Sequence, residues 1–375
     1  MDYMQNDDQR MLSETVERFL HDRAPLGRTR QLLDVEAGFD RDTWTFGCDL
    51  GWSALMVPPE LGGTGGTGAV LDALAIAEHM GRVLYSGPFV QATVVSDAIV
   101  RLADDDQLGR LLPGIVDGST IASWCWGALS VGEDAGRVAV EHERSGAVLR
   151  GEVVGVEAAD EADLFLVSAV DGERPVQFIV PAHALGLSIR PMTTVDITRR
   201  AARLTFDDVV VGAGAMLEDA DGRASLQRQE ALATTLHLAE TVGMMTVVLA
   251  MTTEYMLDRV AFGRPIATYQ ALKHRAADMR LWVEAAAAAT TAAGRALAAS
   301  LPSACIEVSV AKAYVDDHAV DLVQDCIQIH GGIGLTWEHD LHLFLRRAIL
   351  NRERFGTPRD HRVRLLDLLE IGGAR

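Results

Sequence analysis

The sequence is poor in cysteine and in long apolar runs. Its four cysteines are Cys48, Cys125, Cys305 and Cys326, and no two of them form a C-x-x-C pair. This spacing predicts neither a disulfide framework nor a zinc site, and it fits a reducing compartment. No stretch reaches the roughly 18 uncharged apolar residues of a membrane-spanning helix, and the first residues have no signal-peptide pattern. We therefore expect a cytoplasmic protein without a membrane span.

Basic residues are also scarce, since 34 Lys and Arg stand against 53 Asp and Glu, for a net charge of −19. This field repels nucleic acids and anionic lipid surfaces, so we expect neither as a partner. Any phosphate-bearing ligand must be held by a few placed arginines, backbone amides or helix N-termini. With 49% hydrophobic and 23% charged residues in 375, the chain predicts two or three globular units.

The spacing of hydrophobic residues along the sequence changes twice. It is helical from about 5 to 118, with breaks at Pro25, Pro58, Pro88 and Pro113, and it then alternates in short β-rich runs to about 222. Long helical segments follow, at 224–258, 267–299, 303–330, 338–352 and 359–371. We expect a mainly α fold with a middle antiparallel β domain, divided as 1–118, 119–222 and 223–375. The last part predicts an antiparallel bundle that also packs against other subunits.

Two patterns are weak as functional motifs. Residues 63–68 satisfy G-x-G-x-x-G, but no clean strand precedes them, so an interhelical turn is favoured over dinucleotide binding. His339 and His342 are three residues apart on a predicted helix, but no third ligand lies at a recognisable distance. We therefore predict no metal site.

Two further segments could bind a phosphate-bearing ligand. In the first, Arg259 could pair with a phosphate, Phe262 could cover a flat ring, and Gln270 lies near a helix N-terminus. The alternative is that Arg259 complements a helix dipole and Phe262 belongs to the core.

The second segment joins Gln328 to Gly331 and Gly332. Gly331 could simply cap a helix, but two adjacent glycines would also let the backbone approach a pyrophosphate. The next helix is predicted to start at Thr336 as N-cap and to end with Arg346 and Arg347.

Four segments in order resemble the acyl-CoA dehydrogenase family over nearly the whole chain. They are 51–63 (GWSALMVPPELGG), 196–200 (DITRR), 259–266 (RVAFGRPI) and 328–334 (QIHGGIG). The resemblance implies an N-terminal helical domain, a middle β domain and a C-terminal four-helix bundle. It also implies an FAD-dependent α,β-dehydrogenation of an acyl-CoA thioester, with an electron-transfer flavoprotein as acceptor. Arg259, Phe262 and Gln270, with Gln328, Gly331 and Gly332, would hold the FAD diphosphate and adenosine across a subunit interface.

The same comparison shows that the sequence departs from the family pattern at the positions expected to surround the reacting atoms. The family's usual glutamate base, counted along the C-terminal segment, falls on Phe355, which cannot accept a proton. The family's alternative position falls on Ala233, and Glu230 and Glu240 lie nearby on the same predicted helix. The flavin-ring loop expected within 124–134 and the tryptophan expected within 151–156 are both absent. The sequence thus keeps the residues expected around the adenosine half of FAD and lacks those expected around its flavin ring.

Three interpretations remain. The chain resembles the non-catalytic partner in α2β2 acyl-CoA dehydrogenases of actinobacterial steroid side-chain degradation, in which it would complete the FAD pocket of a homologous catalytic subunit. Alternatively, it is a self-sufficient homotetrameric enzyme with Glu240 or Glu230 as base. A third possibility is a non-enzymatic assembly protein with the same fold.

Overall fold

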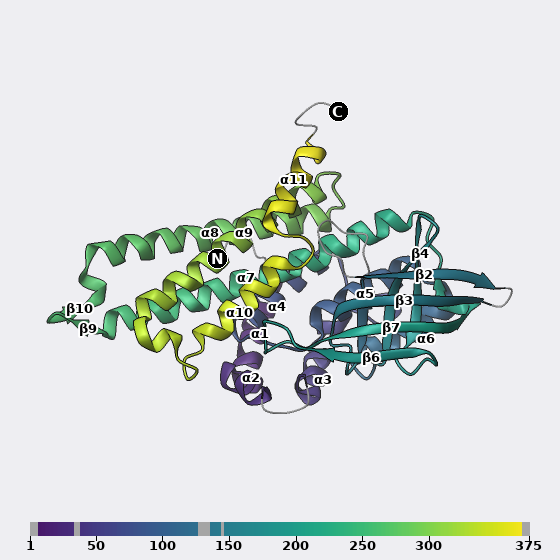
Figure 1. Ribbon diagram of the computed structural model, residues 1–375, viewed down its shortest axis with the longest axis horizontal. Helices are drawn as coiled ribbons and strands as arrows, with labels where there is room; N and C mark the ends of the chain where they lie inside the picture. Colours follow the sequence, from purple (N-terminus) through teal and green to yellow (C-terminus); the bar gives the residue numbers. More distant parts are fainter. Residues whose placement is uncertain (1–6, 34–37, 127–135, 144–145, 370–375) are drawn as a thin grey trace.

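The computed structural model describes residues 7–33, 38–126, 136–143 and 146–369. Helices form the first part of the chain, a sheet follows, and long helices form the last part. Figure 1 shows the sheet at one end of an elongated molecule and the β9–β10 hairpin at the other, with α7, α8 and α9 running between them. The expected fold class is confirmed.

The first part is built from six α-helices and two short 3₁₀ turns. Helix α6 begins with a capping box, in which the side chains of Asp104 and Gln107 each accept from the other's backbone N–H. Pro113 does not end this helix, contrary to the predicted break. It lies in the last turn, where only the bond to the Gly109 carbonyl is lost. The elements are α1 (Asp7–Arg23), α2 (Leu26–Leu32), α3 (Arg41–Asp49), η1 (Trp52–Ala54), η2 (Pro59–Leu61), α4 (Ala69–Arg82), α5 (Phe89–Leu102) and α6 (Asp105–Val116).

The glycine-rich segment 63–68 joins η2 to α4 as a turn. A Cβ on Gly63 would lie 1.9 Å from the Val57 carbonyl oxygen, and one on Gly65 would lie 2.7 Å from the same atom. These glycines thus let the chain approach its own backbone, which accounts for the pattern without a nucleotide.

The middle part is an eight-stranded sheet with the path β6-β7-β3-β2-β4-β5-β8, and β1 pairs with β4 off this path. The expected purely antiparallel sheet is wrong in this detail, because β1 and β2 both pair with β4 in parallel. The strands are β1 (Ala122–Cys125), β2 (Gly136–Glu143), β3 (Gly146–Glu157), β4 (Leu164–Asp171), β5 (Arg174–Pro181), β6 (Leu187–Met192), β7 (Ala201–Gly212) and β8 (Met216–Leu217), with η3 (Ala213–Ala215) between the last two.

The last part contains three long helices and two shorter ones. Helix α10 begins at Leu341 and not after Thr336, because Arg30 donates to Asp340 and to the Trp337 carbonyl and so holds the intervening residues in a turn. Arg346 and Arg347 therefore lie in the middle of α10. The elements are α7 (Gly222–Asp258), β9 (Val260–Ala261), β10 (Arg264–Pro265), η4 (Ile266–Thr268), α8 (Gln270–Ala298), α9 (Ala304–His330), η5 (Gly331–Leu335), α10 (Leu341–Glu353) and α11 (Pro358–Leu368).

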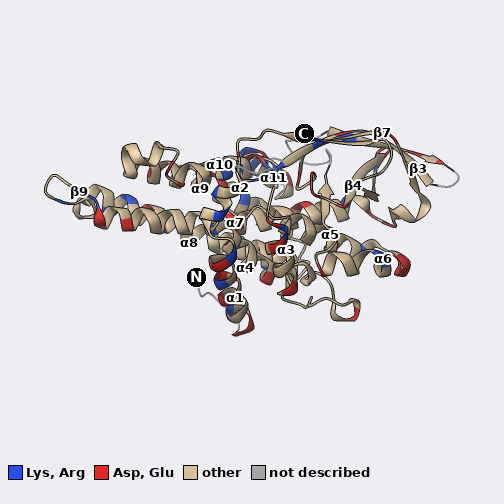
Figure 2. Ribbon diagram, turned by 90° about the horizontal axis from the view of Figure 1, so that it is seen from below, with Lys and Arg blue, Asp and Glu red and all other residues tan. Residues whose placement is uncertain are grey.

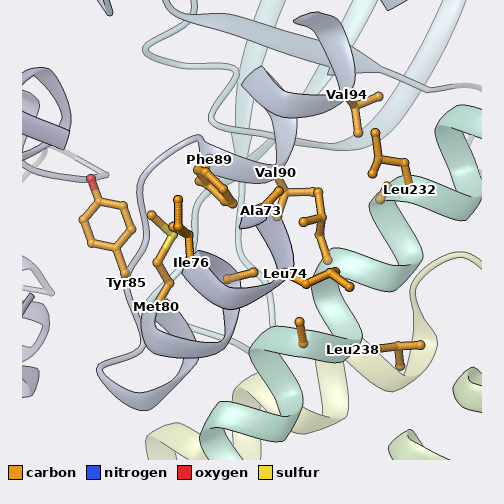
Figure 3. Packing of buried hydrophobic residues seen from close by; sticks show 14 of the residues in the cluster. Ala73, Leu74, Ile76, Met80, Tyr85, Phe89, Val90, Val94, Leu232 and Leu238 are labelled. Atoms are coloured by element: carbon orange, nitrogen blue, oxygen red, sulfur yellow. The ribbon is translucent and has the colours of Figure 1, made fainter. Parts of the chain in front are cut away.

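Helix α7 is the central element of the molecule. It is the one helix among the described residues that is long and apolar enough to cross a membrane, but 89% of its apolar window is buried inside the protein. Figure 3 shows buried side chains of α4 and α5, among them Ala73, Leu74 and Val94, facing α7 and its Leu232. The apolarity of α7 is thus satisfied by packing.

Two glycines allow α4 and α7 to cross in close contact. A Cβ on Gly81 of α4 would lie 1.9 Å from the Glu240 carbonyl oxygen, and one on Gly243 of α7 would lie 1.9 Å from the Glu78 carbonyl oxygen. The crossing therefore fixes how far α7 is shifted along its axis relative to α4, and it thereby fixes the position of Glu240.

We predict that Gly243→Ala lowers the free energy of unfolding by about 1–3 kcal/mol, because the added methyl overpacks the crossing. Gly109→Ala is the matched control, since Gly109 lies on the exposed side of α6 with open space around it. That variant should be neutral or gain up to about 1 kcal/mol. Denaturant unfolding of both variants tests the prediction, and equal effects would contradict it.

Candidate cofactor and active site

The six candidate residues for the FAD diphosphate and adenosine all lie at the hairpin end of the bundle. One group follows the end of α7 and the start of α8, and the other follows the end of α9 (Figure 1). The two helix ends are joined by Tyr255, whose ring stacks on His330 at 4.3 Å and whose hydroxyl donates to the His330 carbonyl over 3.3 Å. All six are exposed in the single chain: Arg259, Phe262, Gln270, Gln328, Gly331 and Gly332.

The backbone at this end is open to a ligand. Gly331 caps α9 with a φ of +65°, as the capping interpretation predicts, and nothing lies within 4 Å of a Cβ added to Gly331 or Gly332. Phe262 is 97% exposed on the hairpin, so it is not a core residue in this chain. An arginine, a flat ring and bare backbone are the groups that bind a dinucleotide's diphosphate and base. The residues present fit the adenosine half of FAD.

The two histidines of the rejected metal motif pack against aromatic rings. His342 stacks on Trp337 at 4.8 Å, and His339 meets the edge of His330 at 4.8 Å. Among the described residues no cluster of three or more His, Cys, Asp or Glu could hold a metal ion.

A separate cavity lies where the sheet meets α5 and α10, and aromatic side chains fill much of its surroundings. Phe355 is 2% exposed, stacks on Trp124 with ring centroids 5.9 Å apart, and meets Trp126 edge-on at 5.0 Å. The cavity that these rings line has a volume of about 220 Å³. Small-molecule pockets usually span about 300–1,000 Å³, so this space is small for a flavin ring together with an acyl chain.

The turn that carries Phe355 is anchored by buried polar groups. His361 Nε2 lies 2.8 Å from the Phe355 carbonyl, which can only accept, so Nε2 carries the proton and Nδ1 accepts from Ser309 Oγ at 3.1 Å. Burial lowers the pKa of His361 to about 4. Lys312, which pairs with Asp316, donates to the Asn351 carbonyl over 2.6 Å. These contacts hold Phe355 at a φ of +57°, an unusual value for a residue other than glycine.

Glu240, one of the two candidate bases, is held between two arginines. Its Oε1 accepts from Arg199 Nη2 over 2.6 Å and from Arg347 Nη1, and the residue is 2% exposed. Burial alone raises the pKa of Glu240, but Arg199 and Arg347 outweigh that effect and hold it well below its usual value. The neighbouring His237 has a lowered pKa because of burial, so it is neutral at pH 7. A carboxylate in this setting is a poor proton acceptor.

Arg347, the second arginine on Glu240, is fully buried and also contacts the segment 196–200. Its Nε donates to Asp196 Oδ2, and its Nη2 donates to Thr198 Oγ1 over 2.7 Å. The segment 196–200, noted in the sequence only as a family match, thus supplies both an anion and a hydroxyl to this arginine.

Glu157 completes the cluster on the cavity side. It pairs with Arg354 over 2.9 Å and with Arg199 over 3.5 Å, and Gln91 donates to its other oxygen over 3.0 Å. Burial raises the pKa of Glu157, but Arg199 and Arg354 together lower it to about 2. The charges balance, because the cluster consists of Arg199, Arg347 and Arg354 with Glu157, Asp196 and Glu240. We call these residues the buried ion cluster.

Glu230, the second candidate base, is also held in an ion pair. Its carboxylate pairs with Arg364 of α11 over 3.1 Å. Neither Glu230 nor Glu240 lines the cavity beside Phe355.

The sequence pointed to Phe355 and the six bundle-end residues. It also drew attention to segment 196–200, Glu240 and Arg347, but it did not predict that they meet in an ion cluster. Glu157, Arg347 and Arg354 belong to no motif, and Glu157 is one of three charged residues in β3, so its place in the sequence does not distinguish it. Of the segments noted for departures from the flavin-ring pattern, 151–156 lies in β3, where Val154 and Gly155 line the cavity. Residues 127–134 of the expected flavin loop lie outside the described residues.

Comparison with known proteins agrees with this architecture. Residues 6–119 match the family model described as acyl-CoA dehydrogenase, N-terminal domain, and residues 221–362 match acyl-CoA dehydrogenase, C-terminal domain. The chain therefore belongs to the acyl-CoA dehydrogenase family, whose members are FAD-dependent flavoprotein oxidoreductases. The resemblance to the family is thereby confirmed.

Several individual relatives are similar to this chain over almost its whole length. The acyl-CoA dehydrogenase IpdE2 of Mycolicibacterium smegmatis is 30% identical over 361 residues, which are 96% of this chain and 98% of the relative. Among solved structures, the Tcur3481-Tcur3483 steroid ACAD has 27% identity and a TM-score of 0.87 and covers 98% of this chain and 99% of that chain. The ChsE4-ChsE5 complex from Mycobacterium tuberculosis, at 24% identity, full coverage of both chains and a TM-score of 0.88, shows the shared fold.

We predict that Glu240→Gln lowers the free energy of unfolding by about 3 kcal/mol, because it leaves Arg199 and Arg347 short of a buried anion. Turnover per folded molecule, in whatever assembly is active, should stay unchanged. Glu254→Gln is the control, since Glu254 lies exposed on the same helix. Wild-type stability together with intact flavin and lost turnover would instead identify Glu240 as a base.

A pH dependence follows from His361. Because its pKa is lowered in the folded chain, the unfolded chain binds a proton first as the pH falls below about 6.5. The stability that neutral His361 contributes is therefore complete above pH 6.5 and is lost progressively toward pH 4, by up to about 3 kcal/mol.

Unfolding measured across this range should show a shallower slope in His361→Gln than in the wild type. His21→Gln, at an exposed site on α1, should keep the wild-type slope. Equal slopes in all three proteins would contradict the assignment.

Proposed function

We propose that this chain is the partner subunit of a heteromeric, FAD-dependent acyl-CoA dehydrogenase, and that it supplies the diphosphate and adenosine pocket to a homologous catalytic subunit. The observation that carries the proposal is the contrast between the two ends of the chain. At the hairpin end, the candidate residues for FAD are exposed and their backbone is open. Beside Phe355, aromatic rings line a cavity of only about 220 Å³, and arginines pair with Glu157, the carboxylate that lines it.

The chemistry of the reaction supports a division of labour. FAD supplies the hydride acceptor when bound, and the protein must add a carboxylate that removes the α proton of the thioester. Phe355 has no proton-accepting group, and neither Glu240 nor Glu230 lines the cavity. Glu157 does line it, but Arg199 and Arg354 pair with its carboxylate and lower its pKa. A carboxylate from a different subunit would have to do this work.

The relatives favour the same assembly. The names of two similar structures each give a pair of different proteins, Tcur3481 with Tcur3483 and ChsE4 with ChsE5. The first is described as a steroid ACAD, so a steroid side-chain CoA ester is the substrate class we propose for the assembly. We further propose an α2β2 arrangement in the cytoplasm, with an electron-transfer flavoprotein as acceptor.

The alternative of a self-sufficient homotetramer needs a base within this chain. The two arginines on Glu240 and the Arg364 contact of Glu230 argue against it. A non-enzymatic assembly role would leave the open backbone at Gly331 and Gly332 without a use.

We predict that the chain purified alone is colourless or nearly so and shows no acyl-CoA-dependent reduction of an artificial electron acceptor. Co-expression with its partner should yield a yellow, active complex. Full activity of the lone chain would overturn the proposal.

Within that complex, Arg259→Ala should lower the FAD content and raise the dissociation constant of FAD at least tenfold, since a charged contact to phosphate is lost. Arg280→Ala is the control, because Arg280 lies exposed in the middle of α8 and pairs with Glu284 one turn along the same helix. An unchanged FAD content in Arg259→Ala would place the diphosphate elsewhere.

A further inference from the structure

The hairpin between α7 and α8 is tied to the start of α8 by the side chain of Tyr269. The Tyr269 hydroxyl donates to the Ala261 carbonyl in β9 over 3.0 Å, and the Arg264 guanidinium of β10 lies over the Tyr269 ring, 4.2 Å from its centroid. One side chain thus contacts both strands of the hairpin. We call Ala261, Arg264 and Tyr269 the hairpin clamp.

The hairpin is short and projects away from the helices. Its strands β9 and β10 are each two residues long, and Figures 1 and 2 both show it at the far end of the long helices. A two-stranded hairpin on its own is at best marginally stable in water. The clamp therefore adds an anchor that the two strands cannot supply by pairing with each other.

The turn of this hairpin presents Phe262 in an unusual backbone conformation. Phe262 has a φ of +53° and Gly263 a φ of +81°, as in a type I′ turn, where asparagine, aspartate and glycine are the usual residues. The Phe262 ring is 97% exposed, so the chain gains almost nothing from its burial. An exposed aromatic ring held on strained backbone favours a contact with a molecule outside this chain.

The clamp also sets where Phe262 lies relative to a second residue proposed to bind FAD. Tyr269 is the N-cap of α8, and Gln270 is the first residue of that helix. Because Ala261 directly precedes Phe262, the hydrogen bond from Tyr269 fixes the base of the turn beside the N-terminus of α8. A ligand that contacts both Phe262 and Gln270 then orders less of the chain when it binds, which strengthens binding.

We propose that Tyr269, with Arg264 as its partner, is a positioning residue that pre-organises Phe262 to cover the adenine ring of FAD. This inference rests on the proposed function. Tyr269 acts through the hairpin, and its own side chain is engaged by the Ala261 carbonyl and the Arg264 guanidinium.

The first test needs no cofactor. Tyr269→Phe keeps the ring beneath Arg264 but removes the hydroxyl, so amide hydrogen exchange in segment 260–265 of the full chain should become about fivefold faster, the worth of one hydrogen bond. Tyr314→Phe is the control, since Tyr314 is half-buried on α9 outside the clamp, and its exchange in this segment should equal that of the wild type. Wild-type exchange in Tyr269→Phe would overturn the proposal.

The second test measures the dissociation constant of FAD in the complex with the partner subunit, after the flavin has been removed and added back. Tyr269→Phe should raise this constant about fivefold, and Tyr269→Leu, which also removes the stacking on Arg264, at least tenfold. In a Phe262→Ala background, Tyr269→Phe should have no further effect, because the clamp acts through that ring. A full fivefold effect in that background would overturn the positioning role.

The same measurements separate this inference from the proposed function. If Arg259→Ala and Phe262→Ala weaken FAD binding but Tyr269→Phe does not, the clamp alone is overturned. If neither Arg259→Ala nor Phe262→Ala weakens it, FAD lies elsewhere, and the proposed function and the clamp are both overturned.

Discussion

The buried ion cluster is the interaction on which the rest of the site depends. It joins the segment after β6, the strand β3, the middle of α7, and the middle and C-terminal end of α10. It consists of three arginines and three carboxylates. Charges in such a position are stable only when every partner is present, because one unpaired ion in a low-dielectric interior costs several kcal/mol. The cluster therefore fixes how the sheet, α7 and α10 meet.

That constraint has a chemical consequence. A catalytic carboxylate needs a pKa near the working pH and access to the substrate. In this chain Glu157, which lines the cavity with Phe355, and Glu240 are paired with arginines, and their pKa values lie low. Aromatic rings line the same cavity. These carboxylates therefore stabilise the folded chain, and the exposed residues proposed to hold FAD lie at the other end of the bundle.

The sequence predicted the features that depend on local patterning. The long helices α7, α8 and α9 were located to within a few residues, because apolar periodicity marks them and the turn at Gly263 and Pro265 and the glycines after His330 mark two of their ends. The short strands β1 and β8 were missed, and so was the edge strand β6, which contains Pro191. The start of α10 was misplaced because it depends on Arg30, 310 residues before Asp340. The ion cluster was missed for the same reason, since Arg347 is 107 residues from Glu240 and 151 from Asp196.

The stoichiometry of FAD in the purified assembly tests the central claim most directly. If this chain contributes only an adenosine pocket, absorbance of released flavin against quantified protein should give about one FAD for every two chains, one of each kind. One FAD for every chain, including this one, would mean that a flavin ring is seated beside Phe355, and it would contradict the account.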